Sequence, residues 1–331
     1  MRIAVLGAGA WGTALAIAFS RNHHVTLWGR NETQMSAIAA RRVNDKFLPD
    51  APLEQSIAVT SRLADAVGAA ELILIVTPTA ALDSTIRAIH DAPPSDTANV
   101  PVLWACKGFD KTTGKLPHET IASLVPTGTR YGALSGPSFA DEVAKGLPCA
   151  LTLAANDAEF ASTTAAALSY STLRVYSSTD LIGVELGGAL KNVMAIAAGI
   201  SDGMQLGLNA RAALITRGLA EMVRLGVAMG GKPETFMGLT GMGDLILTAT
   251  GNLSRNRKVG VLLAEGKSLD TILRDLGHVA EGVNSAATAL TLANQFQVSM
   301  PITEAVNAVL FQQANPRDAL KALLAREAKA E

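Results

Sequence analysis

The sequence predicts an N-terminal α/β domain built on a doubly wound sheet, followed by an all-α C-terminal domain. Three observations carry this prediction. Apolar runs closed by Gly or Pro alternate with helical segments in the first half, a glycine-rich turn joins the first strand to the first helix, and helical periodicity takes over after Ser178. We expect domains at residues 1–178 and 179–331, with the boundary at a segment, SSTD, that suits a helix N-cap.

The chain has 331 residues, 49% of them hydrophobic and 17% charged, which suits two domains of ordinary size. Its formal net charge of -1 argues against a nucleic-acid partner, because binding to a phosphate backbone needs a broad basic surface. Cys106, Cys149 and the five histidines have no metal-ligand spacing. We therefore expect a reducing compartment and no metal site.

The N-terminus does not suit a signal peptide, because glycines at positions 7, 9 and 12 interrupt its apolar run. No run approaches the roughly 18 apolar residues that span a bilayer, and the longest core-like stretch is LILIV at residues 72–76. We therefore expect a cytoplasmic protein that is not inserted in a membrane.

The expected elements of the first half begin with a strand, RIAVL at residues 2–6, and a helix-forming run, TALAIAFS at residues 13–20. Further strands are expected within four apolar runs that end in Gly or Pro, at residues 24–29, 71–78, 100–108 and 131–137. Because both faces of these strands are apolar, the pattern favours a parallel sheet with helices on both sides.

The turn between the first strand and its helix reads GAGAWG at residues 7–12, the GxGxxG pattern of a Rossmann-like dinucleotide-binding fold. Gly7 allows the tight turn, Gly9 lets a pyrophosphate approach the backbone, and Gly12 lets the helix pack on the strand. The helix N-terminus favours the anion. Trp11 either covers the cofactor or packs in the core.

The second strand ends in GRN at residues 29–31, where an NAD-binding protein usually has a carboxylate for the ribose 2′-hydroxyl. No acidic residue occurs there before Glu32. The guanidinium of Arg30 can instead pair with a 2′-phosphate, which favours NADP over NAD. An exposed Arg30 without a ligand is the alternative, and Arg41 and Arg42 either contribute or lie on the surface.

Five segments of the second half carry apolar residues at helical spacing, at residues 180–200, 209–230, 268–276, 281–296 and 302–311. The alanine and glycine content of the first segment favours close packing of its backbone. Lys191 lies in the middle of this segment, so it either extends to solvent or is buried with a partner. Asp244 and Thr248, four residues apart, could supply that partner, although Asp244 could also cap a helix.

A basic run, LSRNRK at residues 253–258, stands out in a chain with little charge. Such a run is usually a solvated face. Because the chain as a whole is nearly neutral, any anion that this run binds is expected to be small.

Six motifs together resemble the NAD(P)-dependent glycerol-3-phosphate dehydrogenases of the bacterial type, in the same order and over nearly the whole chain. They are GAGAWGTALA, WACKG, SGPSFA, ELGGALKNVMAIAAGI, GMGDLILTATGNLSRNRKVG and VAEGVNSA. The resemblance implies reversible, NAD(P)H-dependent reduction of dihydroxyacetone phosphate to sn-glycerol 3-phosphate, which supplies phospholipid synthesis. It also implies a homodimer.

The resemblance implies that Lys191 is the acid–base group and that Asp244 holds it. The other catalytic positions that it implies are Lys107, Thr248 and Asn192. The positions implied for the substrate are Lys107, Gly136, Ser138, Lys191, Asp244, Ser254, Arg255 and Asn256, with Arg255 as the phosphate clamp. The positions implied for the cofactor are Gly7, Gly9, Ala10, Trp11, Gly12, Arg30, Asn31, Lys107, Ala140, Arg255, Val279 and Glu281.

Three points stay open under this resemblance. Glu281 could serve only to complement a helix dipole, and Arg257 and Lys258 are either solvated or add a supporting field. The family often has a hydroxyl residue where this chain has Ala10, which removes one possible hydrogen bond to phosphate. Rival interpretations are a reductase acting on 2-hydroxy acids or ketopantoate, and a cofactor-sensing protein without catalysis.

Overall fold

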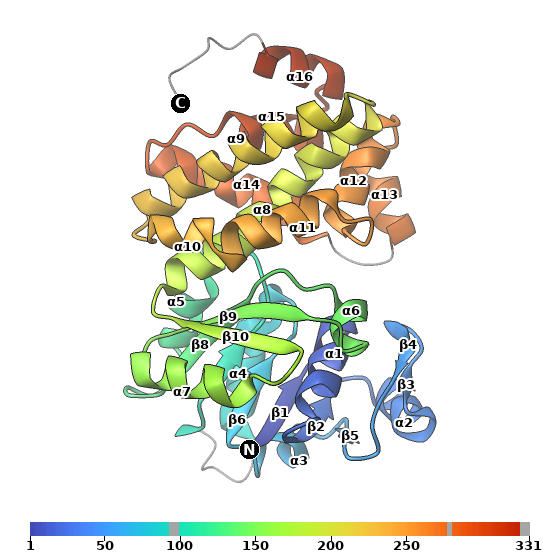
Figure 1. Cartoon of the computed structure of the whole chain (residues 1–331), viewed down its shortest axis with the longest axis vertical. Helices are drawn as coiled ribbons and strands as arrows, with labels where there is room; N and C mark the ends of the chain where they lie inside the picture. Colours follow the sequence, from blue (N-terminus) through green and yellow to red (C-terminus); the bar gives the residue numbers. More distant parts are fainter. Residues whose placement is uncertain (93–98, 277–279, 325–331) are drawn as a thin grey trace. The chain divides into compact units, whose positions relative to one another are not determined.

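The computed structural model describes residues 1–92, 99–276 and 280–324. The described chain divides into two compact units (Figure 1). The first comprises Met1–Asp110 and Lys115–Leu181, and the second comprises Lys111–Gly114 and the chain from Ile182 onward. The first unit is built on a sheet and the second on helices, which confirms the predicted fold class.

An eight-stranded sheet forms the centre of the first unit, in the order β10-β9-β8-β7-β6-β1-β2-β5. Its strands are β1 (Arg2–Leu6), β2 (His24–Trp28), β5 (Ala58–Thr60), β6 (Leu72–Ile75), β7 (Val102–Trp104), β8 (Tyr131–Ser135), β9 (Cys149–Ala155) and β10 (Leu173–Ser178). The five runs predicted as strands contain β1, β2, β6, β7 and β8, so those predictions are confirmed.

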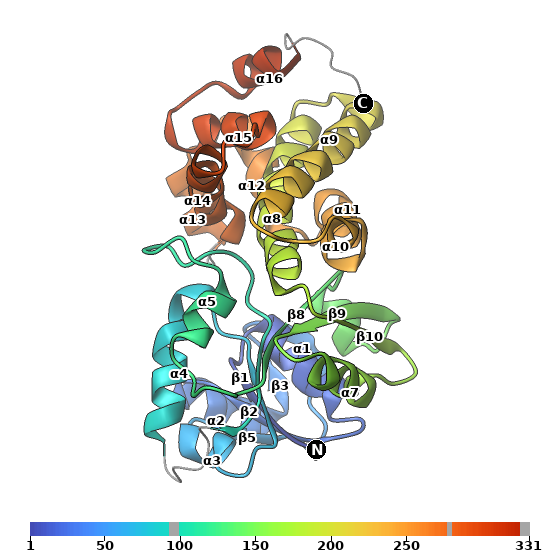
Figure 2. The same ribbon diagram turned by 90° about the vertical axis from the view of Figure 1, so that its left-hand side faces the viewer.

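Helices cover both faces of this sheet, α1 and α7 on one side and α4 and α5 on the other (Figure 2). The helices of the unit are α1 (Ala10–Phe19), α2 (Glu32–Arg41), α3 (Leu63–Val67), α4 (Leu82–Asp91), α5 (Pro117–Ala122), α6 (Ala140–Ala144) and α7 (Ala158–Leu168), with a short 3₁₀ turn, η1 (Thr79–Ala81). A two-stranded ribbon, β3 (Val43–Asn44) and β4 (Leu48–Pro52), follows α2.

The five predicted strands are mutually parallel, as expected, and the sheet departs from this arrangement at β9, a strand that the sequence does not predict. Strands β8 and β9 pair antiparallel, with Ser135 opposite Thr152 and Gly132 opposite Ala155. A parallel neighbour needs a crossover that returns the chain to the far end of the sheet. The connection after β8 contains only the five-residue α6, and β9 starts at the edge where β8 ends.

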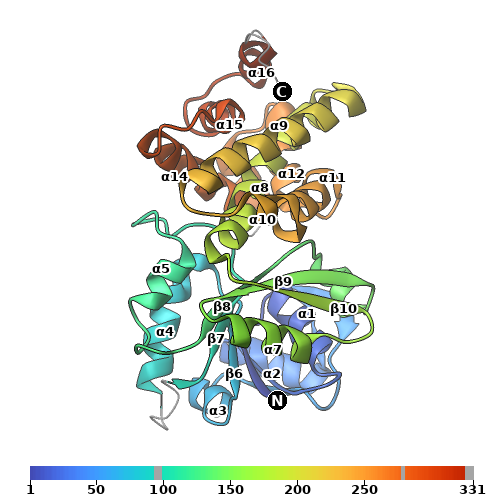
Figure 3. The ribbon, with the colours of Figure 1, turned by 60° about the vertical axis from the view of Figure 1, so that its left-hand side comes forward.

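The order of the six parallel strands indicates at which edge of the sheet a ligand would bind. From β1 the chain proceeds outward through β2 to β5 and then returns to β6 on the other side of β1. It continues from β6 through β7 to β8, which Figure 3 labels. The order therefore reverses between β1 and β6, and ligands of doubly wound sheets bind outside the carboxyl ends of the strands at such a point. The turn at residues 7–12 follows β1 at this edge.

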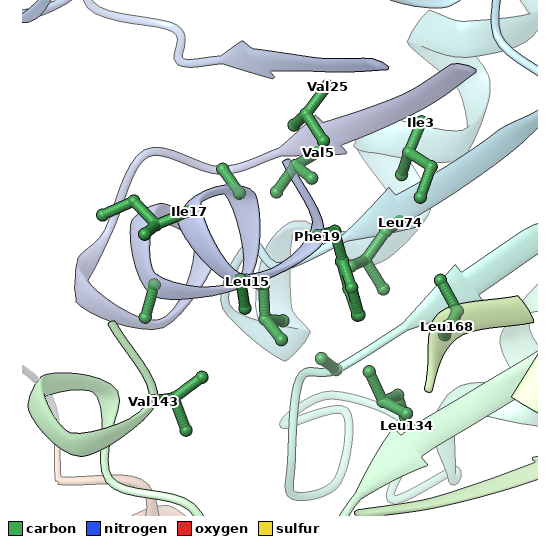
Figure 4. Packing of buried hydrophobic residues seen from close by; sticks show 14 of the residues in the cluster. Ile3, Val5, Leu15, Ile17, Phe19, Val25, Leu74, Leu134, Val143 and Leu168 are labelled. Atoms are coloured by element: carbon green, nitrogen blue, oxygen red, sulfur yellow. The ribbon is translucent and has the colours of Figure 1, made fainter. Parts of the chain in front are cut away.

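The core of the first unit joins α1 to the sheet. Figure 4 shows Leu15 and Phe19 projecting from α1 into a buried cluster that also holds Leu74 of β6 and Leu134 of β8. Leu15 and Phe19 share a helix face because they are four residues apart. Each fully buried side chain of this kind contributes about 1.5–3 kcal/mol, so the glycine turn precedes a firmly anchored helix.

The second unit is helical. Its helices are α8 (Leu181–Gly203), α9 (Gly207–Ala228), α10 (Pro233–Met237), α11 (Asp244–Thr250), α12 (Arg255–Ala264), α13 (Leu269–Leu276), α14 (Glu281–Gln295), α15 (Pro301–Phe311) and α16 (Pro316–Leu324), with a π-type turn at Leu239–Gly243. The five segments predicted as helical overlap α8, α9, α13, α14 and α15, which confirms them.

Helix α8 corrects one expectation, because it has 23 residues and an 18-residue window within it has a mean hydropathy of 1.4, which is long and apolar enough to cross a bilayer. The sequence interpretation found no such run, since glycines and Lys191 interrupt it. Among the described residues it is the one helix that meets this criterion, and 89% of its apolar window is buried inside the protein. It is therefore accounted for as the core helix of its unit.

Candidate active site: two clusters on two units

The glycine turn of the first unit has the geometry of an anion site. Gly7 has φ +129, and a Cβ on it would lie 2.7 Å from the carbonyl oxygen of Val76. A Cβ on Gly12 would lie 1.9 Å from the carbonyl oxygen of Gly7, so only glycine lets α1 pack on the turn. The position of a Cβ on Gly9, in contrast, has no heavy atom within 4 Å.

Helix α1 starts directly after this turn, with Gly9 as its N-cap and Ala10 as its first residue. No side chain caps the helix and its first turn holds no acidic residue. The first N–H groups and the positive end of the helix dipole are therefore not used by a capping or acidic side chain, which suits an anionic ligand. Trp11 is partly buried and packs against the core cluster, which supports its packing role.

The segment after β2 offers one exposed cation. Arg30 is exposed and has no hydrogen-bond or ion-pair partner within the part of the chain that the structure describes. Asn31 caps α2, where its side chain accepts a hydrogen bond from the N–H of Gln34 at 2.8 Å. Arg41 pairs with Asp45. Arg42 donates to backbone carbonyls, among them that of Ile57 at 2.9 Å, so Arg30 is the better candidate for a 2′-phosphate.

Three of the implied substrate residues meet at one carbonyl group after β7 and β8. Lys107 Nζ donates to the carbonyl oxygen of Gly136 at 3.3 Å, and Ser138 Oγ donates to the same oxygen at 3.2 Å. Gly136 has φ +144, a conformation that L side chains rarely adopt. The carbonyl of Lys107 in turn accepts from Thr79 Oγ1 at 3.1 Å. Both loops leave the same edge of the sheet as the glycine turn.

Ala140, an implied cofactor contact, is the first residue of α6. It is partly buried and packs against the core cluster of the first unit. The nearest hydroxyl in the motif is that of Ser138, which is engaged with Gly136.

Lys191 is buried, with 7% of its surface exposed, so the solvent-directed alternative is wrong. Its Nζ donates to Asp244 Oδ1 at 2.5 Å and to Thr248 Oγ1 at 2.9 Å. Thr248 Oγ1 also lies 2.6 Å from the carbonyl oxygen of Asp244, one helical turn earlier on α11. A charged amine in such a place requires a counterion, and Asp244, which is 1% exposed, supplies it.

Glycine makes this ion pair sterically possible. A Cβ on Gly187 of α8 would lie 2.7 Å from the carbonyl oxygen of Thr240, in the π-type turn that precedes Asp244. The turn therefore lies directly on α8, one helical turn before Lys191. Gly243 rather than Asp244 is the N-cap of α11, and it makes no side-chain cap, which corrects the capping alternative for Asp244.

A second network of the helical unit fixes Asn192 and Asn256. Asn256 Nδ2 donates to Asn192 Oδ1 at 2.9 Å, and the N–H of Gly282 donates to Asn256 Oδ1 at 3.0 Å. Asn192 Nδ2 lies 3.4 Å from the carbonyl oxygen of Gly188. Both asparagines are buried, so this network holds α8, α12 and α14 in register beside Lys191.

The basic run opens helix α12. Arg255 is the first residue of that helix, and Ser254 is its N-cap, accepting from the N–H of Arg257 at 3.2 Å. Arg255 is exposed and has no partner among residues 1–92, 99–276 and 280–324. An exposed guanidinium beside a helix N-terminus that carries no acidic residue suits an anion.

Arg257 is not solvated, which corrects one alternative. Its Nε and Nη2 both lie 2.7 Å from Asp202 Oδ2, and Arg211 Nη1 donates to the same carboxylate at 3.1 Å. Arg257 Nη1 also reaches Asn252 Oδ1 at 3.3 Å. Arg257 thus ties the loop before α12 to the end of α8, whereas Lys258 is exposed.

Sequence reasoning missed Asp202, because an aspartate near the end of an apolar helix has no motif of its own. Its only signal is that two arginines of the same domain need a counterion. Asp202 stabilises a tight crossing of α8 and α12. A Cβ on Gly199 would lie 2.0 Å from the carbonyl oxygen of Arg257, and a Cβ on Gly260 would lie 2.1 Å from the carbonyl oxygen of Ile196. The prediction of close backbone packing along α8 is confirmed.

Two implied cofactor contacts remain. Glu281 is the first residue of α14, where it complements the helix dipole whether or not it also meets a ligand. Val279 lies outside the described residues. Within the described residues there is no group of three or more metal-ligating side chains.

Comparisons with known proteins agree with this arrangement. The model of the N-terminal part of the NAD-dependent glycerol-3-phosphate dehydrogenases matches residues 2–161, and the model of their C-terminal part matches residues 180–321. A glycerol-3-phosphate dehydrogenase [NAD(P)+] of Aromatoleum aromaticum is 54% identical over the full length of both chains. One of Thiobacillus denitrificans is also 54% identical over the full length of both.

The solved structure of a glycerol-3-phosphate dehydrogenase from Coxiella burnetii aligns with a TM-score of 0.91 at 39% identity, covering 98% of this chain and 99% of that one. A ketopantoate reductase from Ralstonia eutropha, which represents the rival enzyme class, aligns with a TM-score of 0.60 at 16% identity. That second likeness shows a shared fold alone.

Proposed function

The chain belongs to the NAD-dependent glycerol-3-phosphate dehydrogenase family, and from this premise we propose how its two clusters divide the work. The enzyme reduces dihydroxyacetone phosphate reversibly to sn-glycerol 3-phosphate with NAD(P)H. We propose that the edge of the sheet carrying residues 7–12 holds the cofactor and that the cluster around Lys191 carries out proton transfer.

The glycine turn suits a dinucleotide, because the open space at Gly9 admits a pyrophosphate and the uncapped N-terminus of α1 attracts it. When bound, the dihydronicotinamide supplies the hydride for C2 of the substrate. The exposed guanidinium of Arg30 favours NADPH over NADH, since it can pair with the 2′-phosphate. Ala10, Trp11, Asn31, Ala140, Val279 and Glu281 remain proposed cofactor positions on the family resemblance alone.

Proton transfer is assigned to Lys191. Reduction of the ketone adds hydride to C2 and leaves charge on its oxygen, so the oxygen needs a proton donor beside it. The Asp244 carboxylate, at 2.5 Å, stabilises the Lys191 ammonium in its buried place and orients it together with Thr248. Lys191 gives one N–H proton to the oxygen, and the reverse reaction takes that proton back.

Asn192 and Lys107 are proposed as orienting groups. Asn192 is held by Asn256, which itself is fixed by the N–H of Gly282. Lys107 is held by the carbonyl of Gly136, and Ser138 binds the same oxygen. Fixed polar groups of this kind stabilise developing charge without reorganising during the reaction.

Phosphate recognition is assigned to Arg255 and the N-terminus of α12, with Ser254 and Asn256 flanking it. The observation that carries this assignment is an exposed guanidinium without a protein partner among the described residues, on a helix end that holds no acidic side chain. A carboxylate substrate would also suit an arginine. A dianionic phosphate makes fuller use of a guanidinium and a helix N-terminus together.

The experiment that tests this assignment is Arg255→Ala. Binding energy from the phosphate is remote from C2 and can be used for orientation, so the substitution should lower kcat as well as raise KM. We expect a loss of about 2–5 kcal/mol in kcat/KM, the range for removing one partner of a desolvated charge pair.

The matched control is Lys258→Ala, which removes an exposed cation three residues away and should change kcat/KM less than about fivefold. With dihydroxyacetone, which lacks the phosphate, wild type and Arg255→Ala should be almost equally poor. If Arg255→Ala reduces turnover of both substrates alike, Arg255 holds the fold or the cofactor instead.

Three broader proposals rest on the family. The product supplies glycerophospholipid synthesis, the enzyme is cytoplasmic, and it forms a homodimer. We also propose that residues 1–178 and 179–331 are the cofactor-binding and catalytic domains. Sedimentation analysis at several protein concentrations tests the dimer, and a monomer at all of them would rule it out.

A further inference from the structure

The carbonyl oxygen of Ala8, in the middle of the glycine turn, accepts hydrogen bonds from two side-chain amides. Asn44 Nδ2 donates to it at 3.0 Å and Gln34 Nε2 donates to it at 3.0 Å. Asn44 belongs to β3 and Gln34 to α2, so both come from beyond the βα unit that carries the turn (Figure 1). A carbonyl oxygen has two lone pairs, and these two amides occupy both.

Asn44 also ties the turn to the helix that follows it. Its Nδ2 donates to Thr13 Oγ1 at 2.8 Å, and the backbone N–H of Thr13 donates to the carbonyl oxygen of Gly9 at 3.0 Å. Asn44 is 1% exposed and Thr13 is fully buried. A buried amide with both N–H groups engaged by oxygen atoms is fixed in orientation, because the flipped amide would set oxygen against oxygen.

The side-chain oxygen of Asn44, unlike its side-chain nitrogen, makes no hydrogen bond with the described residues. This oxygen, Oδ1, is buried. An unsatisfied buried acceptor is destabilising, so the donor contacts of Asn44 to the turn carry the whole polar role of this side chain.

The orientation of the Ala8 carbonyl determines where the next N–H points. A trans peptide is planar, and its C=O and N–H groups point in opposite directions. Because Asn44 and Gln34 draw the Ala8 carbonyl toward the protein, the N–H of Gly9 is directed away from them. Gly9 is also the residue whose Cβ position is open, with no heavy atom within 4 Å.

We propose that Asn44 and Gln34 are positioning residues for cofactor binding, which hold the Ala8–Gly9 peptide so that the Gly9 N–H donates to the pyrophosphate of NAD(P)H. They do not touch the pyrophosphate in this proposal; they act through the peptide. The inference rests on the proposed role of the 7–12 turn in cofactor binding.

The test is Asn44→Asp, which keeps the shape of the side chain and replaces its two N–H donors by carboxylate oxygen. That oxygen faces the Ala8 carbonyl and Thr13 Oγ1 and cannot donate to either of them. The hydrogen bond from residue 44 that holds the Ala8 carbonyl toward the protein is therefore lost. We expect the Kd for NADPH, measured by fluorescence titration, to rise at least roughly tenfold. At saturating NADPH and substrate, kcat should stay near the wild-type value, which separates positioning of the cofactor from chemistry.

Two further variants keep the test decisive. Gln34→Glu makes the same exchange of donor for acceptor at a partly buried side chain, and it should raise the Kd in the same direction if Asn44→Asp fails to fold. Asn22→Asp makes the matched change at an exposed asparagine of the same unit and should leave the Kd unchanged. Lowering the pH should partly restore binding by Asn44→Asp, because a protonated carboxyl can again donate to Ala8.

The outcomes distinguish this inference from the role of the turn itself. Gly9→Val fills the open space at the turn and should abolish NADPH binding. If Gly9→Val binds NADPH normally, the turn does not hold the cofactor and both proposals fall. If Gly9→Val loses binding but folded Asn44→Asp and Gln34→Glu both bind within about twofold of wild type, only the positioning role is wrong.

Discussion

Replacing Lys191 by methionine tests whether this residue serves chemistry or the fold. The change removes the ammonium and keeps most of the side-chain volume, so no large cavity forms. The Asp244 carboxylate then stays buried at 1% exposure without the cation that lies 2.5 Å from it in the wild type. The variant therefore removes a charge and a proton donor while the packing around the side chain is largely kept.

Two magnitudes follow from the geometry. Removing one partner of a buried ion pair costs about 3–5 kcal/mol of unfolding free energy, because the remaining charge is left uncompensated. Loss of a general acid–base group reduces turnover by at least roughly 10²-fold. NADPH binding should stay near normal, since the residues proposed to hold its pyrophosphate belong to the glycine turn.

The double variant Lys191→Met/Asp244→Asn separates the two effects. It leaves no charge in the buried place, so the unfolding free energy, measured in urea, should return most of the way to the wild-type value. Turnover, followed by the nicotinamide absorbance, should stay as low as in the single variant. Recovery of turnover in the double variant, or a loss of less than tenfold in the single variant, would show that Lys191 is structural.

Three other predictions concern the cofactor, the pH dependence and the helix crossing. Arg30→Asp should shift the preference from NADPH toward NADH, because a carboxylate repels the 2′-phosphate and accepts from the 2′-hydroxyl; an unchanged ratio of kcat/KM values would place Arg30 outside the adenosine pocket. Burial raises the pKa of Glu221 from 4.5 to about 7, so its protonated form is favoured in the fold. Relative to Glu221→Gln, the wild type should therefore be most stable below about pH 4.5 and lose up to about 3 kcal/mol as the pH rises through 7; urea unfolding of both proteins at several pH values checks this, and a constant difference contradicts it. Gly260→Ala should destabilise the helical unit by at least about 1–3 kcal/mol, because its Cβ would lie 2.1 Å from the carbonyl oxygen of Ile196, whereas Gly238→Ala, with its nearest atom at 3.4 Å, should unfold at nearly the same urea concentration as wild type.

The sequence predicts those elements of the fold whose cause is local. Strands such as β6 are continuous apolar runs with a clear end, and the segment that forms α8 has apolar residues at helical spacing. Strands β9 and β10 are not predicted, because CALTLAA and LRVYSS are only partly buried and so do not form continuous apolar runs. The antiparallel pairing of β9 depends on where a connection returns, which no periodicity records.

The same distinction between local and tertiary causes applies to the candidate site. The glycines of the turn and the pairing of Asp244 with Thr248 are local patterns, so spacing alone suggests them. Burial of Lys191 depends on which helices surround α8, and the sequence leaves it open. The role proposed for Asn44 depends on a contact with Ala8 across 36 positions, and neither residue carries a signal of that contact.

The central claim is that this enzyme reduces a phosphorylated ketone with a nicotinamide cofactor. The most direct measurement is oxidation of NADPH and NADH with dihydroxyacetone phosphate, compared with dihydroxyacetone, pyruvate and ketopantoate under the same conditions. We expect rapid turnover of dihydroxyacetone phosphate alone, with NADPH preferred. Equal turnover of any of the three substrates without phosphate would contradict the account.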